Sequence, residues 1–352
     1  MAEPSHHLPL VDVVKAISAQ LIVLHHLAWF GPMSDVAVQA SPLAQTVQSW
    51  LANYGRYAVA AFLAIGGYLA AQAMPMGGLP AGQSAFRLIA QRYVRLVVPF
   101  AAALVLAVLC AWLARQWMTH ESIGSPPQLG QFIAHLLLLH GVLGVESLSA
   151  GVWYVAIDFQ LYALFVALAW LASRTGCRPV SAEFASVALV VGIALASLFH
   201  FSRDDSWDAS ALYFFGAYGF GILGGWASRS SRPFPLLLVL VLLGSCALAI
   251  EFRGRIAVAM LTALALAWAQ MQPWLQARPL FAMFGRTSYA LFLVHFPVCL
   301  VVNALFVRYA PDNPALNLLG VFVAWVASNV AAFPFHRHVE ARLGFRLPRS
   351  GS

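Results

Sequence analysis

The stretch PLLLVLVLLGSCALAI, residues Pro235 to Ile250, contains no charged side chain. Long apolar runs of this kind recur along the chain. A strand of a membrane β-barrel is only about ten residues long and alternates apolar with polar side chains. The unbroken run therefore predicts a helical membrane protein rather than a barrel.

The composition extends this prediction to the whole chain. Of the 352 residues, 61% are hydrophobic and 9% are charged, whereas soluble domains have about 45–50% and about 25%. The 20 Lys and Arg and 13 Asp and Glu residues are too few to cover the surface of a soluble protein of this length. We therefore expect an all-α, polytopic membrane helical bundle that forms one integral-membrane domain over residues 1–352.

Ten stretches are long and apolar enough to cross about 30 Å of hydrocarbon. An eleventh apolar segment, Phe132 to Val145, is shorter and contains His135 and His140, so we expect it to be interfacial or re-entrant. The ten predicted spans lie at about 10–31, 50–73, 96–114, 152–173, 183–201, 211–228, 234–251, 255–272, 287–307 and 315–335.

The distribution of basic residues predicts the orientation of the bundle. With ten spans, 14 of the 20 Lys and Arg residues fall on one side of the membrane and 6 on the other. If the segment Phe132 to Val145 also crossed, this difference would shrink to near parity. Cytoplasmic loops of membrane proteins are richer in Lys and Arg than the loops on the other side. We therefore expect ten spans, with the side that has 14 basic residues and both termini in the cytoplasm.

Other sequence features exclude several classes of protein. The net charge is +7, but the cations lie in short loops rather than in one patch, so no nucleic-acid partner is expected. The first apolar run lacks the features of a cleaved signal and should stay in the mature protein. No CxxC spacing occurs among the four cysteines, so neither a metal site nor a disulfide framework is expected. They are Cys110, Cys177, Cys246 and Cys299.

The first span, VDVVKAISAQLIVLHHL (residues 11–27), carries ionisable side chains that are costly inside a membrane. Lys15 and His26 fall within about 20° on one helical face, about 16 Å apart along the axis. Asp12 lies near the same stripe, and His25 points about 80° away from Lys15. A neutral imidazole near mid-membrane can accept a proton near pH 7, and Lys15 can meet an anionic ligand. Alternatively, the side chains of Lys15 and His26 only extend to the two opposite membrane–water interfaces.

The segment GVWYVAIDFQLY (residues 151–162) places Tyr154, Asp158 and Tyr162 on one helical face. A buried carboxylate must be paired or protonated. Asp158 either orients a histidine and stabilises its imidazolium, or it is a structural residue bonded to the tyrosines.

Two further segments combine basic and polar residues near the cytoplasmic ends of spans. In QRYVRLVVP (residues 91–99), Arg92 and Arg95 stand one turn apart and could bind phosphates or serve only as a positive-inside anchor. In GRTSYALFLVHFPV (residues 285–298), Ser288 and His295 share one face.

Together these segments resemble the membrane-bound acyltransferase-3 family, and they occur in the family's order over most of the chain. Two positions depart from the family pattern: the usual glutamate is Asp158 and the usual arginine is Lys15, which lacks the bidentate fork. The matching residues are Asp12, Lys15 and His26; Phe62 to Tyr68 with Gly66 in place of Ser; Arg92, Arg95, Leu96 and Pro99; Trp153 through Tyr162; and Thr287, Ser288, Tyr289, Phe292, His295 and Pro297.

The resemblance implies transfer of an acyl group, most often acetyl, from cytoplasmic acyl-CoA to a carbohydrate or lipid-linked glycan hydroxyl. It implies a multi-pass protein of the bacterial inner (cytoplasmic) membrane and no metal. We expect His26 to be the general base, with His25 as its catalytic neighbour and Asp158 as its partner. The residues expected to bind the donor are Lys15, Arg92, Arg95, Ser288 and His295.

Two other functions can use the same residues. A multi-span transporter would use the intramembrane His, Lys and Asp as a proton relay, but no internal symmetry is evident. A polymerase or ligase acting on lipid-linked glycans would need large polar outward loops, and the outward segments here are modest.

Overall fold

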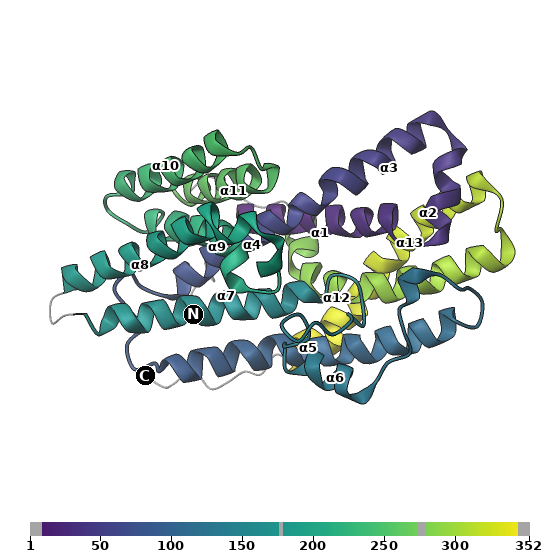
Figure 1. Cartoon of the computed structure of the whole chain (residues 1–352), viewed down its shortest axis with the longest axis horizontal. Helices are drawn as coiled ribbons and strands as arrows, with labels where there is room; N and C mark the ends of the chain where they lie inside the picture. Colours follow the sequence, from purple (N-terminus) through teal and green to yellow (C-terminus); the bar gives the residue numbers. More distant parts are fainter. Residues whose placement is uncertain (1–8, 176–178, 273–278, 344–352) are drawn as a thin grey trace. The chain divides into compact units, whose positions relative to one another are not determined.

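The structure is a computed structural model that describes residues 9–175, 179–272 and 279–343. In this part of the chain every regular element is a helix and no strand occurs, which confirms the all-α prediction. The helices of Figure 1 are α1 (Pro9–Trp29), α2 (Pro32–Ala37), α3 (Pro42–Tyr54), α4 (Ala58–Ala73), α5 (Ala85–Ala114), α6 (Leu129–Leu136), α7 (Trp153–Ser173), α8 (Pro179–Phe199), α9 (Ala211–Ala227), α10 (Phe234–Ile250), α11 (Gly254–Gln270), α12 (Pro279–Tyr309), α13 (Pro314–Phe335) and α14 (Ala341–Leu343).

Nine of the ten predicted spans each coincide with one helix, α1, α5 and α7 to α13, whereas the span predicted at 50–73 contains the end of α3 and the whole of α4. Six of them, α1, α5, α7, α8, α12 and α13, are long and apolar enough to cross a membrane. Helices α9, α10 and α11 have 17 residues each and α4 has 16, which corresponds to about 25 Å. The count of ten spans and the cytoplasmic termini stay predictions. Residues 1–8 and 344–352, and Cys177, lie outside the described residues.

The segment Phe132 to Val145 does not form a long helix. Helix α6 has eight residues, and turns follow it from residue 137 to residue 144. A helix of this length extends about 12 Å and cannot cross a bilayer. The eleventh apolar segment is therefore not a helical span, in agreement with the sequence-based expectation.

Two stacked histidines stabilise this segment. The rings of His135 and His140 are nearly parallel, with centroids 4.1 Å apart. His135 donates from Nδ1 to the carbonyl oxygen of Gln131 and accepts from the amide of Leu148 through Nε2. The His140 side chain is 1% exposed, and neither ring nitrogen has a hydrogen-bond partner in the described residues. Burial and the adjacent His135 ring lower the pKa of His140 from 6.5 to about 4.

Acid is expected to destabilise the fold through His140. The folded chain favours the neutral ring, so between pH 6.5 and about 4 the unfolded chain binds a proton that the folded chain does not. Stability should therefore fall as the pH drops through this window. The thermal unfolding midpoint, measured at about pH 7.5 and about pH 5.5, should fall less in His140→Phe than in the wild type. An equal fall in both proteins would contradict this assignment.

The described chain forms two compact units. Unit 1 contains Met1–Ser18, Tyr57–Tyr93 and Ile157–Gly285, and unit 2 contains Ala19–Arg56, Val94–Ala156 and Arg286–Ser352. Helices α1, α5, α7 and α12 contribute residues to both units. The single domain of residues 1–352 stays a prediction.

Helix α9 forms the centre of unit 1 and contacts α4, α8, α10 and α11. Its sequence is rich in glycine and nearly all of it is buried. Glycines bring α4 and α9 into backbone contact: a Cβ at Gly67 would overlap the carbonyl oxygen of Tyr218, and one at Gly221 would overlap that of Ala64. Such small-residue contacts are typical of membrane helix interfaces, because they let backbones pack closely.

Adding one methyl group at Gly221 is expected to destabilise unit 1. In Gly221→Ala the new Cβ meets the Ala64 carbonyl oxygen, which cannot rotate away. Overpacking a buried site lowers the free energy of unfolding by about 1–3 kcal/mol. We expect a loss near the upper end of this range. The control is Gly192→Ala in α8, where the Cβ meets nothing within 4 Å. Thermal unfolding should show a lower midpoint for Gly221→Ala only. Equal midpoints would show that α4 and α9 can separate at no cost.

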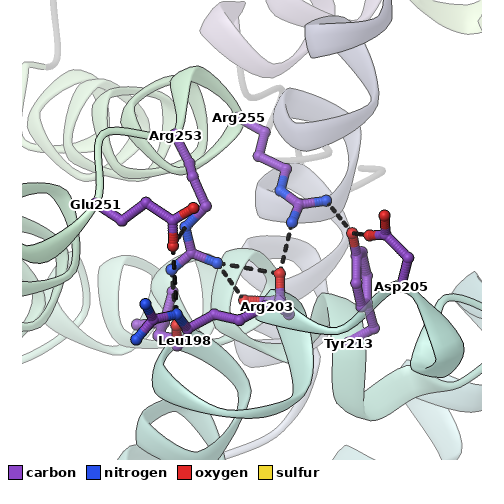
Figure 2. Close-up of polar contacts among 8 residues, drawn as sticks. Leu198, Arg203, Asp205, Tyr213, Glu251, Arg253 and Arg255 are labelled. Atoms are coloured by element: carbon purple, nitrogen blue, oxygen red, sulfur yellow. Dashed lines mark hydrogen bonds and ion pairs between the residues drawn. The ribbon is translucent and has the colours of Figure 1, made fainter.

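Arginines tie the α10–α11 loop to the end of α8 and the start of α9 (Figure 2). Arg253 donates to the carbonyl oxygens of Leu198 and Ser202, at 2.7 and 3.1 Å. Arg255 donates to the carbonyl oxygen of Ser202 and to the hydroxyl of Tyr213. Arg253 thus satisfies a carbonyl group of the last turn of α8, where positive charge is favourable. Both arginines satisfy that of Ser202 in the short helix that follows. This cluster has a structural role.

In unit 2, α12 carries a buried polar residue that connects it to α2. Asn303 accepts a hydrogen bond from the amide of Met33 at 3.1 Å and donates to the carbonyl oxygen of Cys299 at 3.0 Å. One and two turns away, Leu300 and Phe296 belong to a buried cluster with alanines of α5. These contacts fix the position of the α12 segment that contains His295.

Candidate functional site

Helix α1 holds Asp12, Lys15, His25 and His26 in one uninterrupted helix, as the sequence predicts. His26 is partly buried. His25 donates from Nδ1 to the carbonyl oxygen of Leu51 in α3, at 3.0 Å. The two histidines therefore have separate partners, although their ring centroids are only 5.5 Å apart.

His26 is joined to His295 of α12. Nδ1 of His26 lies 2.7 Å from Nε2 of His295. The two rings are inclined by 12°, and their centroids are 5.0 Å apart. This separation is much longer than the distance between the nitrogens, so the rings lie edge to edge in a direct hydrogen bond. Sequence reasoning placed His295 in the donor-binding set, whereas its partner in unit 2 is the predicted base.

A glycine and aromatic side chains line the His26 ring. Phe30 and Phe296 contact it edge-on, with ring centroids 5.4 and 6.4 Å away. Gly151 has φ +82°, and a Cβ there would lie 3.3 Å from Cε1 of His26 and from the Phe292 ring. Only glycine adopts this conformation easily and leaves room for both rings. The His26 ring is thus held in a largely apolar surrounding.

Asp158 is paired with Arg92 in unit 1. Arg92 donates to the Asp158 carboxylate at 2.5 Å, and the side chain of Asp158 is only 8% exposed. The guanidinium of Arg92 also lies over the ring of Tyr162, 5.2 Å from its centroid. This pairing satisfies the requirement that a buried carboxylate be compensated. Because Asp158 belongs to unit 1 and His26 to unit 2, their predicted contact stays a prediction.

Tyr218 of α9 completes this polar cluster, and sequence reasoning did not identify it. Its side chain is 1% exposed, and its hydroxyl has no hydrogen bond within the described residues. A Cβ at Gly66 would lie 3.2 Å from the Tyr218 ring and 3.4 Å from the Asp158 carboxylate, so both side chains border the same glycine. The only available signal was a phenol within the glycine-rich run GAYGFGILGG, residues 216–225.

The other predicted donor-binding residues differ in exposure. Lys15 is partly buried, Ser288 is 6% exposed and Arg95 is exposed. Arg92 and Arg95 stand one turn apart on α5, but Arg92 belongs to unit 1 and Arg95 to unit 2. Arg95 is thus the more accessible of the two cations. Among the described residues, no group of three or more His, Cys, Asp or Glu side chains could hold a metal ion.

A comparison with known families identifies the family of this chain. Residues 9–336 match the family described as "Acyltransferase domain". No curated protein and no solved structure matches the chain. The family match covers all of the segments described above, including both histidines of the pair and the Arg92–Asp158 ion pair. The chain therefore belongs to the membrane-bound acyltransferase-3 family and is a membrane acyltransferase.

Proposed function

We propose that this acyltransferase moves an acyl group, most often acetyl, from cytoplasmic acyl-CoA to a hydroxyl of a cell-surface carbohydrate or lipid-linked glycan. The acceptor lies at the bacterial inner membrane. The observation that carries the proposal is the His26–His295 pair, which lies within two long apolar helices of a chain from an acyltransferase family. One ring nitrogen of His26 is engaged by His295, and the other makes no hydrogen bond within the described residues.

In the proposed reaction His26 acts as the general base. The acceptor hydroxyl gives its proton to the imidazole while its oxygen forms a bond to the thioester carbonyl carbon. The carbon–sulfur bond then breaks, and the thiolate leaves with the proton from the imidazolium. General-base catalysis of this kind contributes about 10²–10⁴ in rate. A covalent acyl-histidine route is the second possibility for the same residue.

The donor's phosphates are expected to meet Lys15, Arg92 and Arg95. Arg92 already shares its charge with Asp158, whereas Arg95 is exposed. We therefore expect Arg95 to contribute more to phosphate binding than Arg92. An arginine at this point offers a bidentate contact that lysine cannot give. Ser288 stays a proposed donor contact on α12.

Release of free thiol from acetyl-CoA tests the proposal directly. The purified protein in lipid or detergent is mixed with acetyl-CoA and with a cell-envelope glycan fraction. The expected result is thiol release that requires the glycan, with the acetyl group found on the glycan by mass spectrometry. Transport without thiol release would contradict the proposal and favour the transporter.

A further inference from the structure

The ring of His295 is completely buried, and each of its nitrogens has a polar partner. Nδ1 lies 2.8 Å from the carbonyl oxygen of Phe292 and 3.1 Å from that of Leu291. Nε2 lies 2.7 Å from Nδ1 of His26. Two of the three polar partners of the His295 ring nitrogens are therefore backbone oxygens. These oxygens decide which ring nitrogen carries the proton.

A carbonyl oxygen only accepts hydrogen bonds, so Nδ1 of His295 carries a proton. A neutral imidazole has one protonated and one unprotonated nitrogen, so Nε2 of His295 holds a lone pair. Nδ1 of His26 must then be the donor in the bond between the two rings. The unprotonated nitrogen of neutral His26 is therefore Nε2.

We infer that His295 is a positioning residue that holds His26 in the tautomer with its proton on Nδ1, so that Nε2 is the nitrogen that accepts the proton of the acceptor hydroxyl. This inference rests on the proposed function, in which His26 is the base. It assigns His295 to catalysis rather than to donor binding, and it names the reacting atom.

The surroundings of His26 agree with this assignment. Nε2 of His26 makes no hydrogen bond within the described residues and is not among their fully buried unpaired atoms. The nitrogen that the pair leaves basic is therefore not completely enclosed by the described residues. A Cβ at Gly151 would lie 3.3 Å from Cε1 of His26, so only glycine leaves this edge of the ring its space.

The pair also supports the charge that forms during the reaction. When Nε2 takes the hydroxyl proton, His26 becomes positively charged and its Nδ1–H bond to His295 becomes charge-assisted, hence shorter and stronger. His295 supplies this stabilisation as a neutral group, without adding a second charge to an apolar interior. As the thiolate leaves, Nε2 returns the proton and the resting tautomer is restored.

Variants of His295 separate positioning from donor binding. His295→Leu cannot accept a hydrogen bond, whereas the side-chain oxygen of His295→Gln can. We expect His295→Leu to lower kcat by about 10²-fold with little change in the KM for acetyl-CoA, because the wrong tautomer removes most of the general-base contribution. His295→Gln should recover most of this loss. The control for packing is Cys299→Ala, one turn along the same buried helix.

The outcomes of this series are distinct. Normal kcat in His295→Leu, or equal losses in the Leu and Gln variants, would overturn the inference. A raised KM with unchanged kcat would return His295 to donor binding and would also overturn it. His26→Ala is assayed in parallel: if it keeps full activity, His26 is not the base and the inference fails with it, although acyl transfer itself stands. The proposed function fails instead if the wild type releases no thiol. An inactive His26→Ala beside a normal His295→Leu rejects only the positioning role.

A measurement that needs no activity checks the tautomer directly. Nitrogen-15 NMR of protein labelled in its histidine rings shows which nitrogen of each neutral ring carries a proton, and the signals missing in His26→Gln identify His26. We expect a protonated Nδ1 in the wild type and in His295→Gln, and loss of this preference in His295→Leu. A protonated Nε2 in the wild type would overturn the inference.

Discussion

Replacing His26 by alanine is expected to lower kcat for acyl transfer by about 10²–10⁴-fold, the contribution of a positioned general base. The KM for acetyl-CoA should change little, because the base acts mainly in the transition state. The measurement is thiol release by the purified variant, with helix content and the unfolding midpoint compared with those of the wild type.

The adjacent histidine provides a matched comparison. His25→Ala removes an imidazole of the same size from the same helix, but His25 is bonded to the backbone of Leu51 rather than to His295. We expect a much smaller loss of activity than in His26→Ala. Full activity in His26→Ala, or equal losses in both variants, would reject His26 as the single base.

Replacing Asp158 by alanine is expected to destabilise the protein by about 3 kcal/mol, because removal of one partner leaves the other buried charge uncompensated. Here the remaining charge is Arg92, whose side chain is 27% exposed, so water recovers part of the cost. Thermal unfolding of the variant in detergent should show a clearly lower midpoint.

The double variant Arg92→Met, Asp158→Leu isolates this effect. It replaces both charges by apolar side chains, which is often neutral for stability, and should recover most of the lost midpoint. If the midpoint of the double variant instead falls by the sum of the falls in the single variants Arg92→Met and Asp158→Leu, the two residues do not interact. If Asp158 also supports catalysis, the double variant should be stable and poorly active, which separates the two roles.

Much of the fold follows from the apolar pattern of the sequence. All ten predicted stretches are helical, and nine of them coincide with a single helix, because a chain in hydrocarbon must satisfy its backbone groups locally. The lengths of the individual helices were less predictable than their positions. The run at residues 50–73 contains two elements, α3 and α4, because the chain turns through Gly55–Tyr57. Apolar side chains alone do not show such a turn.

Several residues of the candidate site carry a signal in the sequence, but their pairs do not. Spacing along a helix placed Lys15 and His26 on one face and indicated that Asp158 needed a partner. It could not show that this partner within unit 1 is Arg92, or that His26 meets His295, since these residues are far apart in the chain. Tyr218 was missed because one phenol in an apolar helix has no distinctive pattern.

By itself, the sequence determined the class of this protein and its family and indicated candidate site residues, because hydrophobicity and local spacing are properties of the chain. Only the tertiary structure decided which polar groups meet. Hydrogen bonds between helices depend on how the helices pack, and the same imidazole is a donor or an acceptor according to the carbonyl oxygens beside it. For that reason, the direction of the His26–His295 bond follows from two backbone oxygens of α12.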